Sequence, residues 1–142
     1  SDRTRDPLPP IQFLDQRGKR RGDAGLSAEL IDYERQREWL EGLAKYAELA
    51  IGRAAAKTPS YSFVPALVDD PDFKKYHTRD AFWSRQIDQI KRAAGQEGGS
   101  RFYYSGMAQA LILDRIAPDW KARAFGDGVM LEDLLAEAVK ED

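Results

Sequence analysis

Four glutamates share one face of a segment that is predicted to be helical. Spacings of four, three and seven residues bring side chains to one side of an α-helix, and these spacings separate Glu34, Glu38, Glu41 and Glu48. Paired carboxylates can hydrolyse glycosidic bonds, but acidic residues are abundant and the spacing singles out no pair. The simplest interpretation is a solvated charged face, in which Glu41 and Lys45 form an i, i+4 ion pair that stabilises the helix by about 0.2–0.5 kcal/mol.

Phenol groups stand at the start of a second predicted helix, in the stretch "FYYSGMAQALILDRI" from Phe102 to Ile116. A phenol O–H aimed at a developing oxyanion is a preorganised donor, and removal of one such donor typically lowers a rate by ~10²-fold or more. The alternative interpretation of Phe102, Tyr103 and Tyr104 is an aromatic cluster packed in a core.

Two helices must position these groups. Ser27 is a predicted N-cap for a long helix that runs to about Ala56. Apolar residues recur along it at spacings of three and four and form one stripe: Leu26, Leu30, Tyr33, Leu40, Ala44, Ala47 and Ile51. Prolines at positions 59, 65 and 71 then favour an extended connection with room for one helical turn. Further helices are predicted at residues 78–94, 102–116, 119–125 and 131–139.

The first 25 residues are predicted to be irregular, because prolines at positions 7, 9 and 10 and glycines at 18, 22 and 25 interrupt a helix. No strand pattern of period two stands out. We therefore predict an all-α protein, an irregular bundle of four to five helices with a long first helix. Residues 1–25 form an irregular N-terminal segment, and residues 26–142 form one helical domain.

Composition excludes several classes of protein. The net charge of -2 argues against a nucleic-acid partner, and no apolar run approaches the ~20 residues of a transmembrane helix. The absence of cysteine excludes disulfides and thiolate metal sites, and neither composition nor motif indicates a compartment. The basic cluster Arg17–Arg21 is predicted to be a solvated loop, with contact to phosphate or an anionic surface as the alternative. Phosphate-binding glycine motifs, a G-x-S-x-G nucleophile and a calcium loop are all absent from the sequence.

The stretch "EWLEGLAKY", residues 38–46, resembles the W-L-x-E-G-L-A-x-Y helix of gluzincin-type zinc metallopeptidases. In that family the glutamate before the glycine is the third zinc ligand, and the resemblance assigns this role to Glu41. Leu40 departs from the commonest form, which has Asn or a spacer directly before the glutamate. A small residue at Gly42, where alanine would favour the helix by about 1 kcal/mol, permits close approach of a neighbouring helix or substrate. Glu38, and less directly Glu34, are candidates to orient a metal-bound histidine.

The second helix is similar to the Y-x-x-G-x-x-x-x-x-x-L-D helix of the same family, in which a tyrosine hydrogen-bonds the developing oxyanion. The resemblance assigns this role to Tyr103, or to Tyr104 if the register differs by one. The two motifs occur in the order that the family has, and "PDWKARAFGDGVMLEDLL" is similar to the closing helices of uncharacterised bacterial members. The resemblance covers about residues 34–139 and implies hydrolysis of a peptide or protein substrate.

Histidine is the missing part of this site. A catalytic zinc of this type needs two histidines on one helix, H-E-x-x-H, whereas the sequence contains only His77. His77 is predicted to be a surface or capping residue, with a substrate contact as the alternative. The leading hypothesis is that the chain is the C-terminal part of a zinc peptidase whose histidines lie in an upstream segment or another chain, so that alone it is inactive. A start at Ser1 rather than Met agrees with this. The alternative is a non-enzymatic helical interaction domain.

Overall fold

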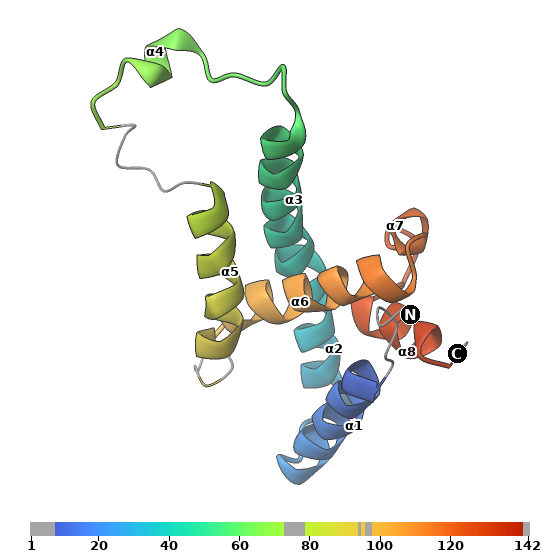
Figure 1. The fold of residues 1–142 in the computed structure, drawn as a ribbon. Coiled ribbons are helices and arrows are strands. Elements are labelled where there is room, and N and C mark those ends of the chain that lie inside the picture. The colour runs from blue at the N-terminus through green and yellow to red at the C-terminus, as the bar shows by residue number, and fades with distance from the viewer. Residues whose placement is uncertain (1–7, 73–78, 94, 96–97, 141–142) are drawn as a thin grey trace.

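A computed structural model describes residues 8–72, 79–93, 95 and 98–140, and all regular structure in these ranges is helical (Figure 1). The elements are α1 (Leu8–Asp23), α2 (Ala28–Arg37), η1 (Glu38–Gly42), α3 (Leu43–Lys57), α4 (Pro65–Val68), α5 (Arg79–Ala93), α6 (Arg101–Ile116), α7 (Trp120–Arg123) and α8 (Leu131–Ala138). Because α2, η1 and α3 are continuous, the described residues contain seven helices rather than the predicted four to five. The all-α prediction is confirmed. His77 lies outside the described residues.

The long helix at residues 28–57, here called the spine helix, is confirmed with its N-cap. Ser27 has extended backbone angles, and its side chain accepts a hydrogen bond from the Leu30 N–H. The helix ends before the Thr58-Pro59 pair, as the preference of a residue before proline for extended angles requires. The sequence did not predict η1, a π-helical turn that interrupts the α-helical hydrogen bonding in the middle of the spine helix.

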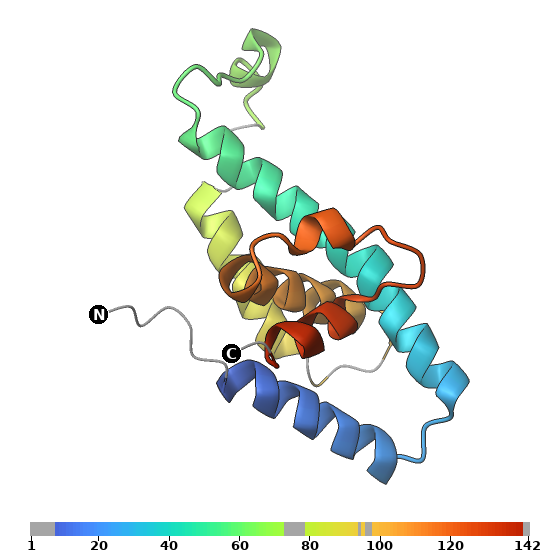
Figure 2. The same cartoon turned by 90° about the vertical axis from the view of Figure 1, so that its right-hand side faces the viewer.

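The prediction of an irregular segment at residues 1–25 is wrong for α1. Pro9 and Pro10 lie in its first turn, where a missing N–H costs no intrahelical hydrogen bond. Gly25 ends it with a left-handed φ of +61°, and the Leu26 N–H reaches back to the Arg21 carbonyl at 3.1 Å. Glycines at 18 and 22 are tolerated within the helix. Figure 2 shows α1 (dark blue) lying beside α8 (red), before the chain turns into α2.

The basic cluster at residues 17–21 belongs to α1 and is therefore not a solvated loop. Arg17 and Arg21 are largely buried and reach carboxylates on α2, η1 and α8. Arg21 holds Glu132 with two hydrogen bonds, of 2.8 and 3.0 Å. Lys19 and Arg20 face solvent. Because residues four apart share one face of a helix, Arg17 and Arg21 both reach carboxylates while Lys19 and Arg20 between them face water.

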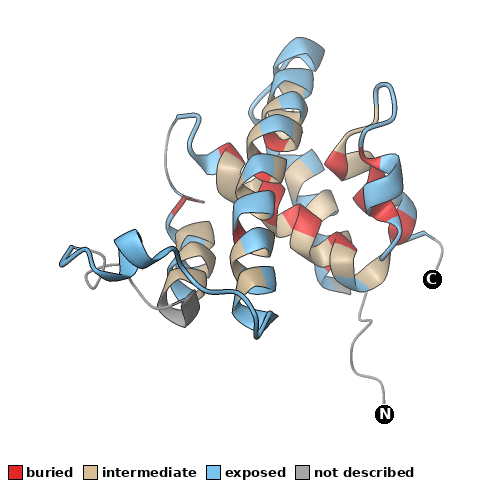
Figure 3. Ribbon diagram, turned by 90° about the horizontal axis from the view of Figure 1, so that it is seen from above, coloured by how far each residue is buried: buried red, intermediate tan, exposed pale blue. Residues whose placement is uncertain are grey.

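The core lies where α6 crosses the spine helix and meets α7 and α8. Figure 3 shows the buried residues gathered there, whereas residues 58–72 are exposed throughout. The main buried cluster is Ala110, Leu113, Trp120, Ala124, Leu131, Leu134, Leu135 and Ala138. The apolar stripe predicted along the spine helix is largely exposed at Leu30, Tyr33, Leu40 and Ile51. In the described residues no helix is both long and apolar enough to cross a membrane.

Candidate functional site

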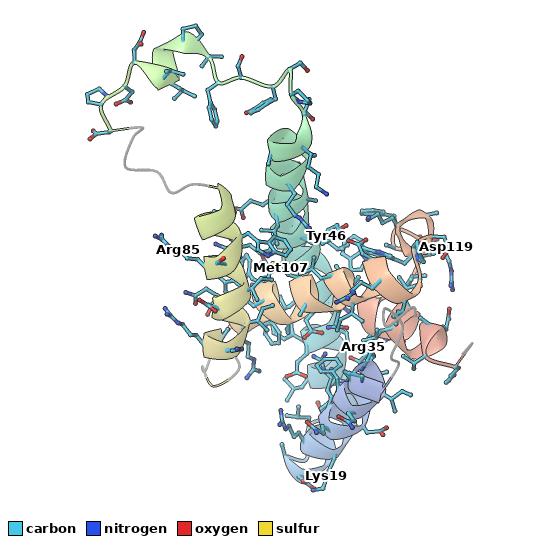
Figure 4. All side chains as sticks on the ribbon, in the orientation of Figure 1. Lys19, Arg35, Tyr46, Arg85, Met107 and Asp119 are labelled. Carbon is cyan, nitrogen blue, oxygen red and sulfur yellow. The ribbon has the colours of Figure 1, made fainter. Side chains whose placement is uncertain are left out.

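The two motif helices meet at a pair of glycines. A methyl group built on Gly42 would lie 2.4 Å from the Gly106 Cα, and one built on Gly106 would lie 2.3 Å from the Glu38 carbonyl oxygen. The two backbones are therefore in direct contact, and Met107 beside them is fully buried (Figure 4). Of the two explanations offered for Gly42, the approach of a neighbouring helix is the one that the fold requires.

On one side of this crossing lie Glu41 and Tyr103. Hydrogen bonding to the nearby Glu41 carboxylate is the main reason that the pKa of the Tyr103 phenol is raised; partial burial and the charge of Glu41 add to the rise, and the charge of Arg37 opposes it. Arg37 lies one turn before Glu41, with its Nη1 2.9 Å from the carboxylate. Glu41 keeps 17% of its side chain exposed. The residues assigned as zinc ligand and oxyanion donor thus lie together, at the rim of the crossing.

Tyr104 points elsewhere. The Lys45 ammonium lies 6.0 Å from the centre of the Tyr104 ring and 5.9 Å from that of Phe82 on α5. The expected ion pair between Glu41 and Lys45 is replaced by one between Lys45 and Glu48, at 2.9 Å. Of the two candidate tyrosines, Tyr103 is therefore the one that hydrogen-bonds the candidate ligand.

Glu38 lies in the core rather than at the rim. Its side chain is 2% exposed, and its oxygens accept hydrogen bonds from three partners: Arg17 Nη2 (2.6 Å), Ser105 Oγ (2.5 Å) and Gln109 Nε2 (2.9 Å). Glu34 is held by Arg21 at 3.1 Å and by Arg101 at 3.3 Å. Both carboxylates, which were expected to orient a histidine, are occupied in joining α1, the spine helix and α6.

The π-turn separates the two central carboxylates. Glu38 and Gly42 both face α6 and are buried, whereas Leu40 is 57% exposed. The exposure of the Glu41 side chain, 17%, lies between these values. The pattern of an ideal α-helix had placed Glu38 and Glu41 on one face. Because the π-turn changes the angle between successive side chains, one carboxylate enters the core while the other reaches Tyr103.

A second phenol–carboxylate pair lies on the other side of the crossing. The Tyr46 hydroxyl donates to Asp114 at 2.7 Å, and the same carboxylate accepts from Trp120 Nε1 at 3.0 Å and lies 2.7 Å from Lys121 Nζ. Burial alone would raise the pKa of Asp114, but these three donors outweigh it and lower that pKa. Burial and Asp114 both raise the pKa of Tyr46, partly offset by Lys121.

Sequence reasoning did not predict the roles of Tyr46 and Asp114, although both stand at fixed positions of the two quoted motifs. Trp39, another motif residue, donates from its indole to the Ala124 carbonyl at 2.7 Å. A general rule would have helped here: a polar aromatic residue buried in a helical core needs a hydrogen-bond partner. Gly42, Gly106, Trp39 and Tyr46 are thus explained by packing and hydrogen bonding, whereas the carboxylates of Glu41 and Asp114 both keep part of their surface exposed.

Metal binding can be tested against the donor set. Among the residues that the structure describes, no group of three or more His, Asp or Glu side chains is arranged to hold a metal ion. Glu41 is a suitable carboxylate donor, but its near neighbours are a cation and a phenol. These residues do not fit a complete zinc site, and at most they contribute one ligand to it. A hollow of about 130 Å³ lies near the C-terminal end of α6, lined by Trp120, Arg123 and Glu137 among others, and includes neither residue of the pair.

No protein-family model, curated protein or solved structure matches this chain. The two motifs and the geometry around Glu41 and Tyr103 are therefore the features of this chain that indicate a function.

Proposed function

We propose that this chain is the C-terminal helical part of a zinc-dependent peptidase of the gluzincin type. Glu41 would supply the third zinc ligand and Tyr103 the oxyanion donor. One observation supports this most directly: the two residues come from motifs far apart in the sequence, yet Glu41 lies close enough to the Tyr103 phenol to raise its pKa, and its side chain is partly exposed. The two histidines would come from polypeptide outside the described residues, and the substrate would be a peptide or protein.

Each residue of the pair has a property that suits its proposed role. The Arg37 guanidinium lies 2.9 Å from the Glu41 carboxylate and compensates its negative charge. A phenol carries its proton at neutral pH, and the upward shift of the Tyr103 pKa acts in the same direction, so that Tyr103 can serve as a hydrogen-bond donor. A zinc ion held with the added histidines would supply an activated water for attack on the peptide bond.

The test uses the natural full-length product and compares two carboxylates of the spine helix. Glu41→Gln is expected to abolish zinc retention and to leave helix content unchanged, because it removes a charged ligand and little packing. Glu48→Gln is the matched control, since Glu48 is 52% exposed and lies two turns further along. Zinc content is measured by elemental analysis after dialysis. Equal zinc in both variants, or no zinc in the wild-type product, would overturn the proposal.

A second candidate, a non-enzymatic helical interaction domain, is supported by a different observation. Large apolar side chains are exposed along the spine helix and along the connection after it: Leu30, Tyr33, Leu40, Ile51, Tyr61, Phe63, Val64, Leu67 and Val68. Such a surface is typical of a protein contact. A full-length product that retains no zinc, and whose partner binding is lost in Leu40→Ser and Ile51→Ser variants, would favour this function over the peptidase.

A further inference from the structure

A narrow stripe of apolar side chains on the spine helix is left uncovered by the fold. Its five members, here called the spine seam, recur at alternating spacings of four and three residues and are all exposed: Leu40, Ala44, Ala47, Ile51 and Ala54. The two large members, Leu40 and Ile51, are 57% and 68% exposed. The buried residue of α3, Leu49, lies on the other side of the helix.

This spacing is typical of a helix that packs lengthwise against another helix. Apolar residues that alternate at four and three form the heptad pattern of paired helices, and such a stripe is narrower than the face that a helix turns to a globular core. The core of this protein contacts α3 from the other side, through Leu49 and through the hydrogen bond from Tyr46 to Asp114. The spine seam is therefore unused after the chain has folded.

The order of large and small side chains along the seam favours a second copy that runs in the opposite direction. In an antiparallel pair whose two-fold axis passes between Ala47 and Ile51, each layer holds at most one large side chain: Ile51 faces Ala47, Leu40 faces Thr58, and Ala44 faces Ala54. In a parallel pair every residue would face its own equivalent, and layers of two large side chains would separate the helices at the layers of two alanines. Alternation of large and small residues across an interface lets the layers interdigitate.

Charge along the spine helix also favours the antiparallel order. The exposed charges differ between its two ends, with carboxylates at Glu29 and Asp32 and cations at Arg53 and Lys57. An antiparallel pair brings the acidic end of each copy toward the basic end of the other, whereas a parallel pair would place like charges together. Glu48, beside the middle of the seam, already has a cation of its own, since Lys45 lies 2.9 Å away.

The exposed apolar surface continues beyond both ends of the seam. Specific interfaces take about 20–30 residues from each partner, which is more than the seam alone supplies. Large exposed side chains lie in α2, at Leu30 and Tyr33, and in the connection at residues 58–72, which is exposed throughout. These two regions lie at opposite ends of the spine helix (Figure 1), so that the antiparallel order brings the connection of one copy toward α2 of the other. With these flanks the surface reaches the size of a stable interface.

We propose that the spine seam binds the spine seam of a second copy of this chain in antiparallel orientation, forming a two-fold symmetric dimer. The inference goes beyond the proposed function, because it requires no metal and involves neither Glu41 nor Tyr103.

The first test is the mass of this chain in solution, measured by sedimentation over a dilution series. The wild type is expected to reach twice its monomer mass of 16.1 kDa and to dissociate on dilution. Ala47→Glu is expected to raise the dissociation constant by about 100-fold or more, because each dimer would bury two unpaired carboxylates. Helix content, measured by circular dichroism, should be unchanged, since Ala47 is exposed in the single chain.

Ala56→Glu is the matched control. Ala56 is also an exposed alanine of α3, but it lies nine residues after Ala47 and therefore on the opposite side of the helix, about 180° away. This variant should dimerise like the wild type. A wild type that stays monomeric at every soluble concentration, or equal dimerisation of the two variants, would overturn the proposal; the seam would then be free or would bind a different protein.

The second test is the orientation of the two helices. The chain contains no cysteine, so that introduced thiols report on single positions. A mixture of Ala44→Cys and Ala54→Cys chains is expected to form a disulfide-linked dimer on mild oxidation. Neither variant alone should do so, because equivalent positions would lie about 15 Å apart along the helices, beyond the reach of a disulfide. Cross-linking of each variant alone, without cross-linking between them, would overturn the antiparallel order.

Failure of this inference and failure of the proposed function are separate results. A monomeric wild type that retains zinc in its full-length form would leave the peptidase proposal standing. A dimer whose full-length form retains no zinc would overturn the peptidase proposal and leave the seam as the established interface.

Discussion

Two phenol–carboxylate pairs flank one helix crossing, and they differ in how completely their carboxylates are used. In the Tyr46–Asp114 pair the carboxylate is bound by a phenol, an indole and an ammonium group. In the Tyr103–Glu41 pair it has a phenol and one guanidinium, at the rim. A carboxylate offers about four lone-pair sites, so three donors leave Asp114 about one free site and two donors leave Glu41 about two. The two carboxylates thus differ in their number of partners and not in access to solvent, since Asp114 is the more exposed, at 32% against 17% for Glu41.

The crossing itself should carry the largest effect, because both pairs depend on it. Gly106→Ala is expected to lower the free energy of unfolding by about 3 kcal/mol, since its Cβ would meet backbone atoms that cannot move aside. The matched control is Gly52→Ala, where nothing lies within 4 Å; it should gain up to about 1 kcal/mol from helix propensity. Urea denaturation measures both. Equal stability of the two variants would show that the glycine contact does not hold the helices together.

Removal of the Tyr103 hydroxyl should lower turnover and leave the free energy of unfolding nearly unchanged. In the full-length product, Tyr103→Phe is expected to lower turnover of a peptide substrate by ~10²-fold with zinc retained. Tyr104→Phe serves as the control and should turn over at the wild-type rate. If Tyr103→Phe is as active as the wild type, Tyr103 has no part in the mechanism.

Removal of the Asp114 carboxylate, which has three partners, should lower stability instead. Asp114→Asn is expected to lower the free energy of unfolding by about 2 kcal/mol, because it weakens charge-assisted bonds in a partly buried position. The pKa of Asp114 is lowered from 3.8 in the fold, so its contribution is present above pH 3.8 and is lost as pH falls through the folded value. Wild-type and variant stabilities should therefore converge in acid. Curves that stay parallel down to pH 2 would contradict this.

The smallest expected effect is a change in the pKa of Tyr103 when its partner Glu41 is replaced. The pKa of Tyr103 is raised, so its hydrogen bond to Glu41 contributes to stability below pH 10 and is lost as pH rises through the folded value. Glu41→Gln should return the phenol pKa toward 10, with a smaller change in urea midpoint than Asp114→Asn causes. An unchanged Tyr103 titration in Glu41→Gln would separate the two residues.

Helix positions followed well from local signals in the sequence. The N-cap at Ser27, the prolines after Lys57 and the glycines before Arg101 bound helices that the structure has within one or two residues of prediction. The difference at α1 has a local cause as well: proline excludes the interior of a helix but is compatible with its first turn, where Pro9 and Pro10 lie.

The buried face of the spine helix could not be predicted in the same way. The apolar stripe predicted there contains residues that are exposed, whereas a carboxylate and a glycine occupy the central buried positions. Hydrophobic periodicity identifies a core face only when apolar residues form it. Here the face is made by backbone contact at Gly42 and by hydrogen bonds to Glu38.

The sequence by itself determined which segments become helical, because caps, prolines and glycines act through the conformations of neighbouring residues. It also placed Glu41 and Tyr103 in separate motifs. Only the tertiary structure decided that Glu38 turns inward and Glu41 reaches Tyr103. That choice depends on a π-turn held by contacts between α1, α6 and the spine helix, and the ideal spacing of an α-helix contains no information about it.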